Sequence, residues 1–339
     1  MSISVTKAML MSAGMGTRLM PFTQTKTKAL LPLMGIPMAQ YVVDSLTFCG
    51  VDCIVANVHH DAKNTRFGLN ALELGSAQLV ISDESQQLLG SGGGIRKALN
   101  YFGSEPFFRA NADVISDINW KALANRHGHL RSQWGVTITL ALFESGPPGD
   151  VYREIFFDSY TGLITGLGEL HSGRPFFAGA AVLEPEALAG LNPHEPSDFI
   201  NDVLKPALRA QKVGFFLTTG AWYDIGSPLL WMNTHLSLIE RLETGNFSTQ
   251  ISRLWMKRIE KTNQRLSEKI WVMNRSSRFC PSNPRHTWQA PCYWGEISQE
   301  GDTRKTPLSL GPHAVLYGPL LGRTQFQNGI GYAGDWVSF

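Results

Sequence analysis

Several features that would assign a protein to a class at once are scarce in this sequence. Only 4 of its 339 residues are cysteines, too few and too scattered for a disulfide framework. Cys49 and Cys53 flank Gly50, which is predicted to end a helix. Two interpretations are open for this pair, a zinc site and buried free thiols. The free thiols are favoured, because no second pair of cysteines has the spacing of zinc ligands.

Neither sign of charge dominates, and long apolar runs are missing. Lys and Arg number 30 against 28 Asp and Glu, so the formal net charge is only +2. This balance gives no electrostatic reason to expect nucleic acid or an anionic membrane as a partner. The first apolar run, residues 8–11, is too short for a signal peptide, and no later run approaches the length of a membrane span. The sequence therefore predicts a cytoplasmic protein.

The chain is long enough to bury a large core, since 43% of its residues are hydrophobic. Short apolar runs alternate with amphipathic stretches over about the first 230 residues, which predicts a parallel sheet with crossover helices. A helix is expected over residues 40–48. The expected strands are residues 8–12, 53–57, 79–82, 107–111 and 136–143.

The pattern changes near Thr234. One long charged helix, with apolar residues from Ile239 to Ile259, is predicted to form a connector. Gly, Pro and Trp then predict a small β-rich domain, whose tryptophans we assign to a core or an oligomer interface rather than to sugar binding. Within it, LGPHAVLYGPLLG fits either hexapeptide coils or ordinary hairpins. The expected domains are residues 1–236, 237–268 and 269–339, with a homo-oligomer formed through the last.

The stretch AGMGTRLMPFTQTKTKALLP, from Ala13 to Pro32, contains closely spaced glycines, then Arg18 and Lys28. Glycines at this spacing fit either an ordinary turn or a loop whose N–H groups point toward a phosphate. The loop is not a dinucleotide fingerprint, because Leu19 occupies the place of the third glycine. It also lacks the Gly-Lys-Ser/Thr ending of a Walker loop.

The residues from Met11 to Pro32 resemble the signature of the sugar-1-phosphate nucleotidyltransferases, A-G-x-G-T-R-L-x-P-x-T-x-x-x-P-K-x-L-x-P. Mannose-1-phosphate guanylyltransferases and N-acetylmuramate 1-phosphate uridylyltransferases are the most similar, the latter in S-G-G-G-I. The resemblance implies an α/β fold with a Rossmann-like, mixed, mostly parallel sheet, flanking helices and a C-terminal β-rich domain, for which a short left-handed β-helix is one option. Four later blocks continue it in the family's order: LGSGGGIRKAL at 89–99, NAD at 111–113, FFAGAAVLEPEAL at 176–188 and GAWYDIGSP at 220–228.

The resemblance implies a reaction between a nucleoside triphosphate and a sugar 1-phosphate. An oxygen of the sugar phosphate would attack the α-phosphorus in line and expel pyrophosphate. Arg18 would hold the departing phosphates, and Lys28 would lie between the α-phosphate and the sugar phosphate. Asp113 and Asp224 would bind Mg²⁺, because carboxylates and phosphates form a hard oxygen site.

Other residues are implied to contact the nucleotide and the sugar. The base would lie on a backbone surface of Ala13, Gly92 and Gly93, although the glycine run also fits a flexible loop before a helix at 95–99. Glu169 and Gly179 would face the sugar, although a Glu in a strand is more often solvated. The backbone N–H groups that would surround the triphosphate belong to Gly14, Gly16 and Thr17.

Three positions depart from the family pattern. Thr27 replaces the proline before Lys28, which removes a restriction on the backbone there. Ala112 replaces a glycine. The lysine expected after Glu169 is missing; Arg174 and Lys205 are candidates to supply that cation instead.

Two functions stay open at this stage. One is an enzyme that makes a nucleotide sugar, and the other is a non-catalytic, regulatory paralogue that binds one. The presence of both predicted cations and both predicted carboxylates favours the enzyme. The base and the sugar cannot be identified from the sequence.

Overall fold

The computed structural model describes residues 3–24, 26–146 and 151–265, together with strands β14 to β21 between residues 270 and 338. The chain divides into two compact units, each built from two separate segments. Unit 1 comprises Met1–Met15 and Val42–Trp222, and unit 2 comprises Gly16–Tyr41 and Tyr223–Phe339.

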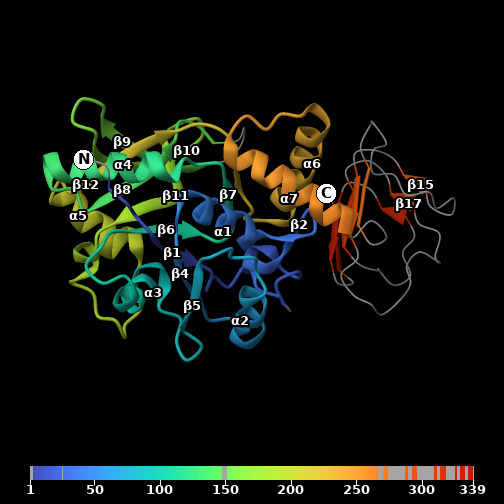
Figure 1. Ribbon diagram of the computed structural model, residues 1–339, viewed down its shortest axis with the longest axis horizontal. Helices are drawn as coiled ribbons and strands as arrows, with labels where there is room; N and C mark the ends of the chain where they lie inside the picture. The colour runs from blue at the N-terminus through green and yellow to red at the C-terminus, as the bar shows by residue number, and fades with distance from the viewer. Residues whose placement is uncertain are drawn as a thin grey trace. The chain divides into compact units, whose positions relative to one another are not determined.

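Unit 1 is built around a nine-stranded mixed sheet of order β5-β4-β1-β6-β11-β8-β12-β10-β9 (Figure 1). Strands β10 and β11 run opposite to the other seven, so the sheet is mixed as expected, but along this order four neighbouring pairs are parallel and four antiparallel, so its pairing is not mostly parallel. Its strands are β1 (Lys7–Met11), β4 (Cys53–Val58), β5 (Gln78–Asp83), β6 (Phe107–Asn111), β8 (Ile138–Phe143), β9 (Tyr152–Asp158), β10 (Leu163–His171), β11 (Phe176–Leu183) and β12 (Val213–Thr218).

Helices cover both faces of this sheet, and neighbouring residues of β6 show how. Phe107 stacks on Phe102, which follows helix α3, with ring centroids 4.0 Å apart. Phe108 points the other way and meets Trp120, the first residue of α4, at 5.1 Å. Side chains alternate between faces along a strand, so α3 and α4 lie on opposite faces. The helices that lie in unit 1 are α2 (Ala62–Asn70), α3 (Gly90–Ala98), α4 (Trp120–Trp134) and α5 (Lys205–Arg209), and α1 (Met38–Cys49) begins in unit 2 and ends in unit 1. Unit 1 also contains the short strand β7 (Val114–Ser116).

Unit 2 packs the opening loop against two helices that come much later in the chain. The indole N–H of Trp231 donates to the carbonyl of Pro32 at 2.9 Å, and its ring meets Phe22 edge-on. Tyr41 meets Trp255 in the same way at 5.9 Å. The elements are β2 (Pro32–Leu33), β3 (Ile36–Pro37), α6 (Pro228–Thr244) and α7 (Gln250–Arg265), and β13 (Trp222–Asp224) lies where the chain passes into this unit.

The prediction of one long helix after Thr234 is wrong, because α6 and α7 are separate. Gly245 follows α6 in the left-handed conformation, with φ 68°, and its N–H donates to the carbonyl of Arg241. This is a common C-terminal cap, since glycine has no Cβ to clash there. Ser252 then donates its N–H to the Thr249 hydroxyl at the start of α7.

The C-terminal strands form two sheets, of orders β14-β16-β18-β20-β21 and β15-β17-β19. From β15 to β20, successive strands alternate between the two, and neighbours within each are parallel. The strands are β14 (Ile270–Met273), β15 (Thr287–Trp288), β16 (Cys292–Gly295), β17 (Ser309–Leu310), β18 (Ala314–Tyr317), β19 (Gln325–Phe326), β20 (Gly329–Tyr332) and β21 (Asp335–Ser338).

The predicted domain boundary at 268/269 lies outside the described residues, and the three-domain division stays a prediction. Across the part of the chain that the structure describes, no helix has both the length and the apolar character needed to cross a bilayer.

Candidate functional site

Gly16 fixes the shape of the opening loop in unit 2. Its φ of 62° lies in the left-handed region, and a Cβ there would come 2.9 Å from Thr23 Cγ2 and 3.3 Å from Lys28 Cβ. The Thr23 hydroxyl donates to the Gly16 carbonyl at 2.8 Å. Glycine is therefore required for both conformation and space, and it brings the loop backbone against Lys28.

Thr27 keeps the backbone that the family's proline would impose. Its φ of −61° and ψ of 147° lie where proline is restricted by its ring. Thr27 is also buried. Packing in unit 2 thus supports the conformation that precedes Lys28, and the departure from the family pattern does not alter it.

Arg18 lies against the turn that follows Asp224, within unit 2. A Cβ built on Gly226 would be 3.3 Å from both Nη1 and Nη2 of Arg18, so the guanidinium rests on bare backbone. The same turn starts helix α6, where the Ser227 hydroxyl accepts from the Leu230 N–H. A larger residue at Gly226 would displace the guanidinium, which explains the glycine.

In unit 1, Ala13 and Gly14 follow strand β1. The N–H of Ala13 donates to Asn57 Oδ1 at 3.3 Å, so this N–H is already hydrogen-bonded within the protein. Gly14 is exposed, and among the described residues no heavy atom lies within 4 Å of a Cβ built on it. Among the described residues, no contact therefore requires a glycine at position 14.

Gly92 and Gly93 lie inside helix α3, which begins at Gly90, so the alternative of a flexible loop before a helix at 95–99 is wrong. Both N–H groups donate to the carbonyl of Ser197, at 2.9 and 3.3 Å. A Cβ on Gly92 would come 2.7 Å from Ser197 Oγ, and one on Gly93 would come 2.8 Å from the Glu195 carbonyl. These glycines allow segment 195–198 to pack closely on the helix.

Alanine substitutions are expected to separate the two kinds of glycine. Gly92→Ala should lower the free energy of unfolding by about 1–2 kcal/mol, because overpacking against backbone exceeds the gain in helix propensity. Gly14→Ala should leave stability within about 0.5 kcal/mol and weaken triphosphate binding, because its methyl group would face the ligand. Denaturant unfolding and nucleotide titration measure the two effects. A stable Gly92→Ala protein would contradict the packing role.

Asp113 follows β6, and the buried Arg109 lies on the same strand. Arg109 Nη1 donates to the Gly179 carbonyl at 3.1 Å, and Cζ lies 5.2 Å from the Phe177 ring centroid. Burial lowers the pKa of the Arg109 guanidinium to about 10, while Asp113 and Asp198 act in the opposite direction. The guanidinium thus remains charged at neutral pH. Sequence analysis missed Arg109, since an arginine within an apolar strand gives no periodic signal.

Both predicted sugar-facing residues lie at irregularities of the sheet in unit 1. The pairing of β10 with β9 shifts between Leu167 and Leu170, around the exposed Glu169. The pairing of β11 with β8 shifts between Phe177 and Ala181, around Gly179, whose φ is 80°. Such bulges redirect side chains and occur often beside active sites.

The two candidates for the missing cation have protein partners. Arg174 Nε lies 3.6 Å from Glu154 Oε1, and Lys205 Nζ donates to Asn201 Oδ1 at 2.8 Å. Arg153, on β9 beside the bulge at Glu169, donates to the Gly168 carbonyl. Arginines therefore surround this bulge although the expected lysine is absent.

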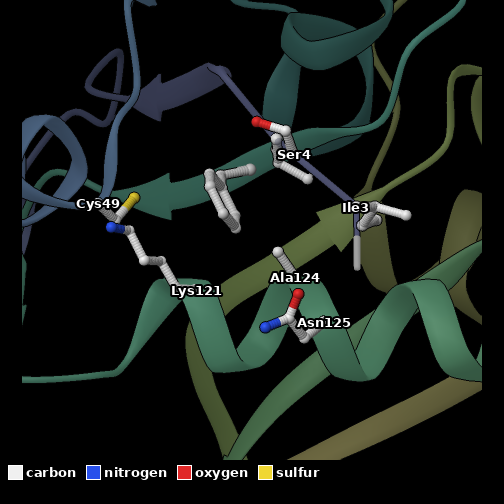
Figure 2. Close-up of a pocket in the computed structure, with 8 residues that line it drawn as sticks. Ile3, Ser4, Cys49, Lys121, Ala124 and Asn125 are labelled. Carbon is white, nitrogen blue, oxygen red and sulfur yellow. The ribbon is translucent and has the colours of Figure 1, made fainter. Parts of the chain in front are cut away.

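A cavity of about 210 Å³ lies near the amino end of β1, lined by Cys49 and Lys121 among others. Figure 2 shows the Lys121 side chain extending from α4 toward Cys49. Burial raises the pKa of the Cys49 thiol to about 11, with smaller opposing effects that include Lys121. Cys49 and Cys53 are free thiols, and within the described ranges no three His, Cys, Asp or Glu side chains group as metal ligands. A protonated thiol is unsuited to nucleophilic chemistry.

The predicted site residues fall into two sets. Those in unit 1 are Ala13, Gly14, Gly92, Gly93, Asp113, Glu169 and Gly179. Those in unit 2 are Gly16, Thr17, Arg18, Lys28 and Asp224. Unit 2 brings Gly16 to Lys28, and Arg18 to the turn after Asp224. Unit 1 brings Gly179 to Asn111 and Arg109, beside the strand that leads to Asp113.

Residues 7–149 match the family described as nucleotidyl transferase. The chain carries a nucleotidyl transferase domain. The resemblance inferred from the sequence motifs is thereby confirmed. The matched residues include the opening loop and extend past the end of strand β8.

Two curated relatives of the nucleotidyl transferase domain are N-acetylmuramate alpha-1-phosphate uridylyltransferases. The protein of Caulobacter vibrioides is 40% identical over 110 residues, which span 32% of this chain and 46% of that protein. The protein of Neisseria meningitidis serogroup B is 28% identical over 225 residues, 65% of this chain and 93% of its own length. Less than half of the Caulobacter protein is thus matched.

Among solved structures, HddC from Yersinia pseudotuberculosis resembles this chain with a TM-score of 0.57 and 19% identity. The similarity covers 69% of this chain and all of HddC. It shows the fold alone, and it supports an α/β nucleotidyltransferase fold with a mixed sheet and flanking helices.

Proposed function

We propose that this chain transfers a nucleotidyl group from a nucleoside triphosphate to a sugar 1-phosphate, giving a nucleoside-diphosphate sugar and pyrophosphate. The observation that carries the proposal is the placement of Arg18 on the Gly226 backbone, two residues after Asp224. A guanidinium fork fixed in this way can bind two phosphate oxygens at once.

Each set of residues has a task in this reaction. The backbone of Gly14, Gly16 and Thr17 would surround the triphosphate, Arg18 would hold the leaving pyrophosphate, and Lys28 would neutralise the entering sugar phosphate. Positioning and charge neutralisation are the main contributions that a protein makes to such a transfer. The base would lie at Ala13 and the start of α3.

Magnesium fits the two carboxylates assigned to it. Asp113 and Asp224 offer hard oxygen ligands, and both residues are half-buried rather than enclosed in the core. Bound Mg²⁺ would neutralise charge on the phosphates. Asp113 belongs to unit 1 and Asp224 to unit 2. The proposal that both carboxylates bind the same ion is therefore based on the family motifs.

For the substrates, we propose uridine triphosphate and N-acetylmuramate 1-phosphate, as in the names of the two uridylyltransferase relatives. Arg153 and Arg174 support an acidic sugar, because both lie beside the bulge at Glu169. The side chain of Arg174 is 58% exposed, so it can reach a ligand carboxylate.

The test is a matrix of four nucleoside triphosphates against several sugar 1-phosphates, with magnesium, scored by pyrophosphate release. We expect the highest rate for uridine triphosphate with N-acetylmuramate 1-phosphate, and lower rates for sugars without a carboxylate. A maximum elsewhere in the matrix would refute the substrate assignment. Nucleotide-sugar binding with no pyrophosphate release in any combination would identify the regulatory paralogue instead.

For residues 269–339 we propose a short β-coil that supports a homo-oligomer. The support is the alternation of β15 to β20 between two parallel sheets, since each coil of such a fold adds one strand to each sheet. Light scattering of the full chain tests the assembly, and a monomer mass would contradict it.

A further inference from the structure

A buried pair of side chains joins the two segments of unit 1 that are assigned to the nucleotide. Asn57, in strand β4, and Glu84, just after β5, are each 1% exposed. The Asn57 amide nitrogen donates to Glu84 Oε1 at 2.7 Å. Neither side chain has a place in the reaction described above, so their burial needs another reason.

Asn57 holds the end of strand β1. Its Oδ1 accepts from the N–H of Ser12 at 2.8 Å and from that of Ala13 at 3.3 Å. The Ser12 hydroxyl also donates to the Asn57 carbonyl at 2.6 Å. Three hydrogen bonds therefore fix the backbone immediately before Gly14.

Glu84 holds the start of helix α3. Its Oε2 accepts from the N–H of Leu89 at 3.0 Å, one residue before the helix begins. A Cβ built on Gly94 would come 2.6 Å from Glu84 Oε1 and 2.8 Å from Asn57 Nδ2. The pair therefore contacts α3 directly at Gly94 and holds the residue that precedes the helix.

The hydrogen bonds of these two side chains form one continuous chain in which each donor and acceptor has a fixed place. Glu84 accepts at both of its oxygens, from the Asn57 NH₂ and from the Leu89 N–H, so Asn57 presents its NH₂ to Glu84 and its oxygen to the loop. Burying a carboxylate is costly, and an apolar contact would stabilise the sheet at lower cost. A hydrogen-bonded polar pair fixes the distance and orientation of the two segments more narrowly than apolar packing would.

We propose that Asn57 and Glu84 are positioning residues for the nucleotide. The pair sets the separation between Ala13 and the first turn of α3, so that both nucleotide segments form one preformed surface before the ligand arrives. This inference rests on the proposed function, because the ligand of that surface is the triphosphate of the proposed reaction.

A reciprocal swap tests this chain of hydrogen bonds. In Asn57→Asp, two carboxylate oxygens face each other. In Glu84→Gln, the new NH₂ must face either the Asn57 NH₂ or the Leu89 N–H. The double variant N57D/E84Q restores every hydrogen bond with the central one reversed, since the amide at position 84 then donates to the carboxylate at position 57.

The measurement is the Kd of each of the four nucleoside triphosphates, by calorimetry without sugar phosphate, well below the unfolding temperature of each variant. We expect each single variant to bind at least about tenfold more weakly, and the double variant to return to within about threefold of the wild type. The KM for sugar 1-phosphate should stay within about twofold. A merely structural role would change the unfolding temperature and leave the Kd of the folded protein unaltered.

Two further variants complete the design. Glu184→Gln is the matched control, because Glu184 is another buried carboxylate of unit 1, which accepts from His127 and Arg131. It should lower stability without changing nucleotide affinity. Glu84→Asp keeps the charge and shortens the reach by one methylene, so it tests the separation even if a single variant above does not fold; we expect at least about fivefold weaker binding.

The outcomes separate this inference from the proposed function. Wild-type affinity in the single variants, or in Glu84→Asp, overturns the positioning role while triphosphate binding by the wild type stands. Weak binding in the double variant, at the level of the single variants, overturns it as well. A wild-type chain that binds none of the four triphosphates overturns the proposed function and this inference together.

Discussion

Asp113→Asn and Asp224→Asn are each expected to lower turnover by at least about a hundredfold, roughly 2.7 kcal/mol in the transition state. Asparagine keeps the size and hydrogen-bonding capacity of the side chain but removes the charge that attracts Mg²⁺. Both aspartates follow or end short strands and are half-buried, so folding should tolerate the change. Pyrophosphate release at saturating magnesium measures the effect.

The matched control for the carboxylates is Asp52→Asn. Asp52 is exposed and precedes β4, at the amino end of the sheet, whereas Asp113 follows the carboxyl end of β6. Its replacement should leave turnover within about twofold, since an exposed charge far from the reacting phosphates contributes little. Near-normal turnover in Asp113→Asn or Asp224→Asn would remove that residue from the proposed metal site.

Arg18→Ala and Lys28→Ala are expected to affect different substrates. In-line transfer needs charge neutralised on both sides of the α-phosphorus, on the leaving pyrophosphate and on the entering sugar phosphate. Lys28→Ala should lower turnover in both directions by about 10²–10³ and impair use of sugar phosphate. Arg18→Ala should chiefly raise KM for triphosphate and pyrophosphate, by at least about tenfold.

Steady-state kinetics in the forward and reverse directions measure these effects, with Lys26→Ala as the control that removes a charge from the same loop. Arg18→Lys should rescue poorly, because an ammonium group cannot form the two parallel hydrogen bonds of a guanidinium. The division of tasks fails if Arg18→Ala retains wild-type affinity for both triphosphate and pyrophosphate.

The parallel strands could be predicted from sequence because they are buried on both faces and give continuous apolar runs. Each of the five expected strands lies within two residues of β1, β4, β5, β6 or β8. The predicted strands did not include β9, β10 and β11, whose antiparallel pairing depends on distant residues rather than on local pattern, and they also missed the parallel strand β12. The family motif identified Gly179, but only the structure shows that it lies at a bulge.

Two other differences between the predicted and the observed helices have local causes. The glycine run at 92–94 was expected to precede the helix, since glycine disfavours helices. Tertiary packing outweighs that preference here, because segment 195–198 approaches Gly92 and Gly93 closely, and the side chains of Glu84 and Asn57 approach Gly94. The break at Gly245 could have been recognised from the glycine and the Ser and Thr residues before α7, which are typical capping residues.

The discontinuity of unit 2 also affects when the loop can fold. Trp231 donates to Pro32 from 199 residues further along the chain, and Trp255 meets Tyr41 later still. A ribosome that adds about 5–20 residues per second needs roughly 10–40 s to make the Trp231 partner after the loop has emerged. The nascent chain therefore carries Arg18 and Lys28 for that time without the helices that hold them, and an incomplete polypeptide released before Trp231 lacks the partner that orders its first ligand-binding loop.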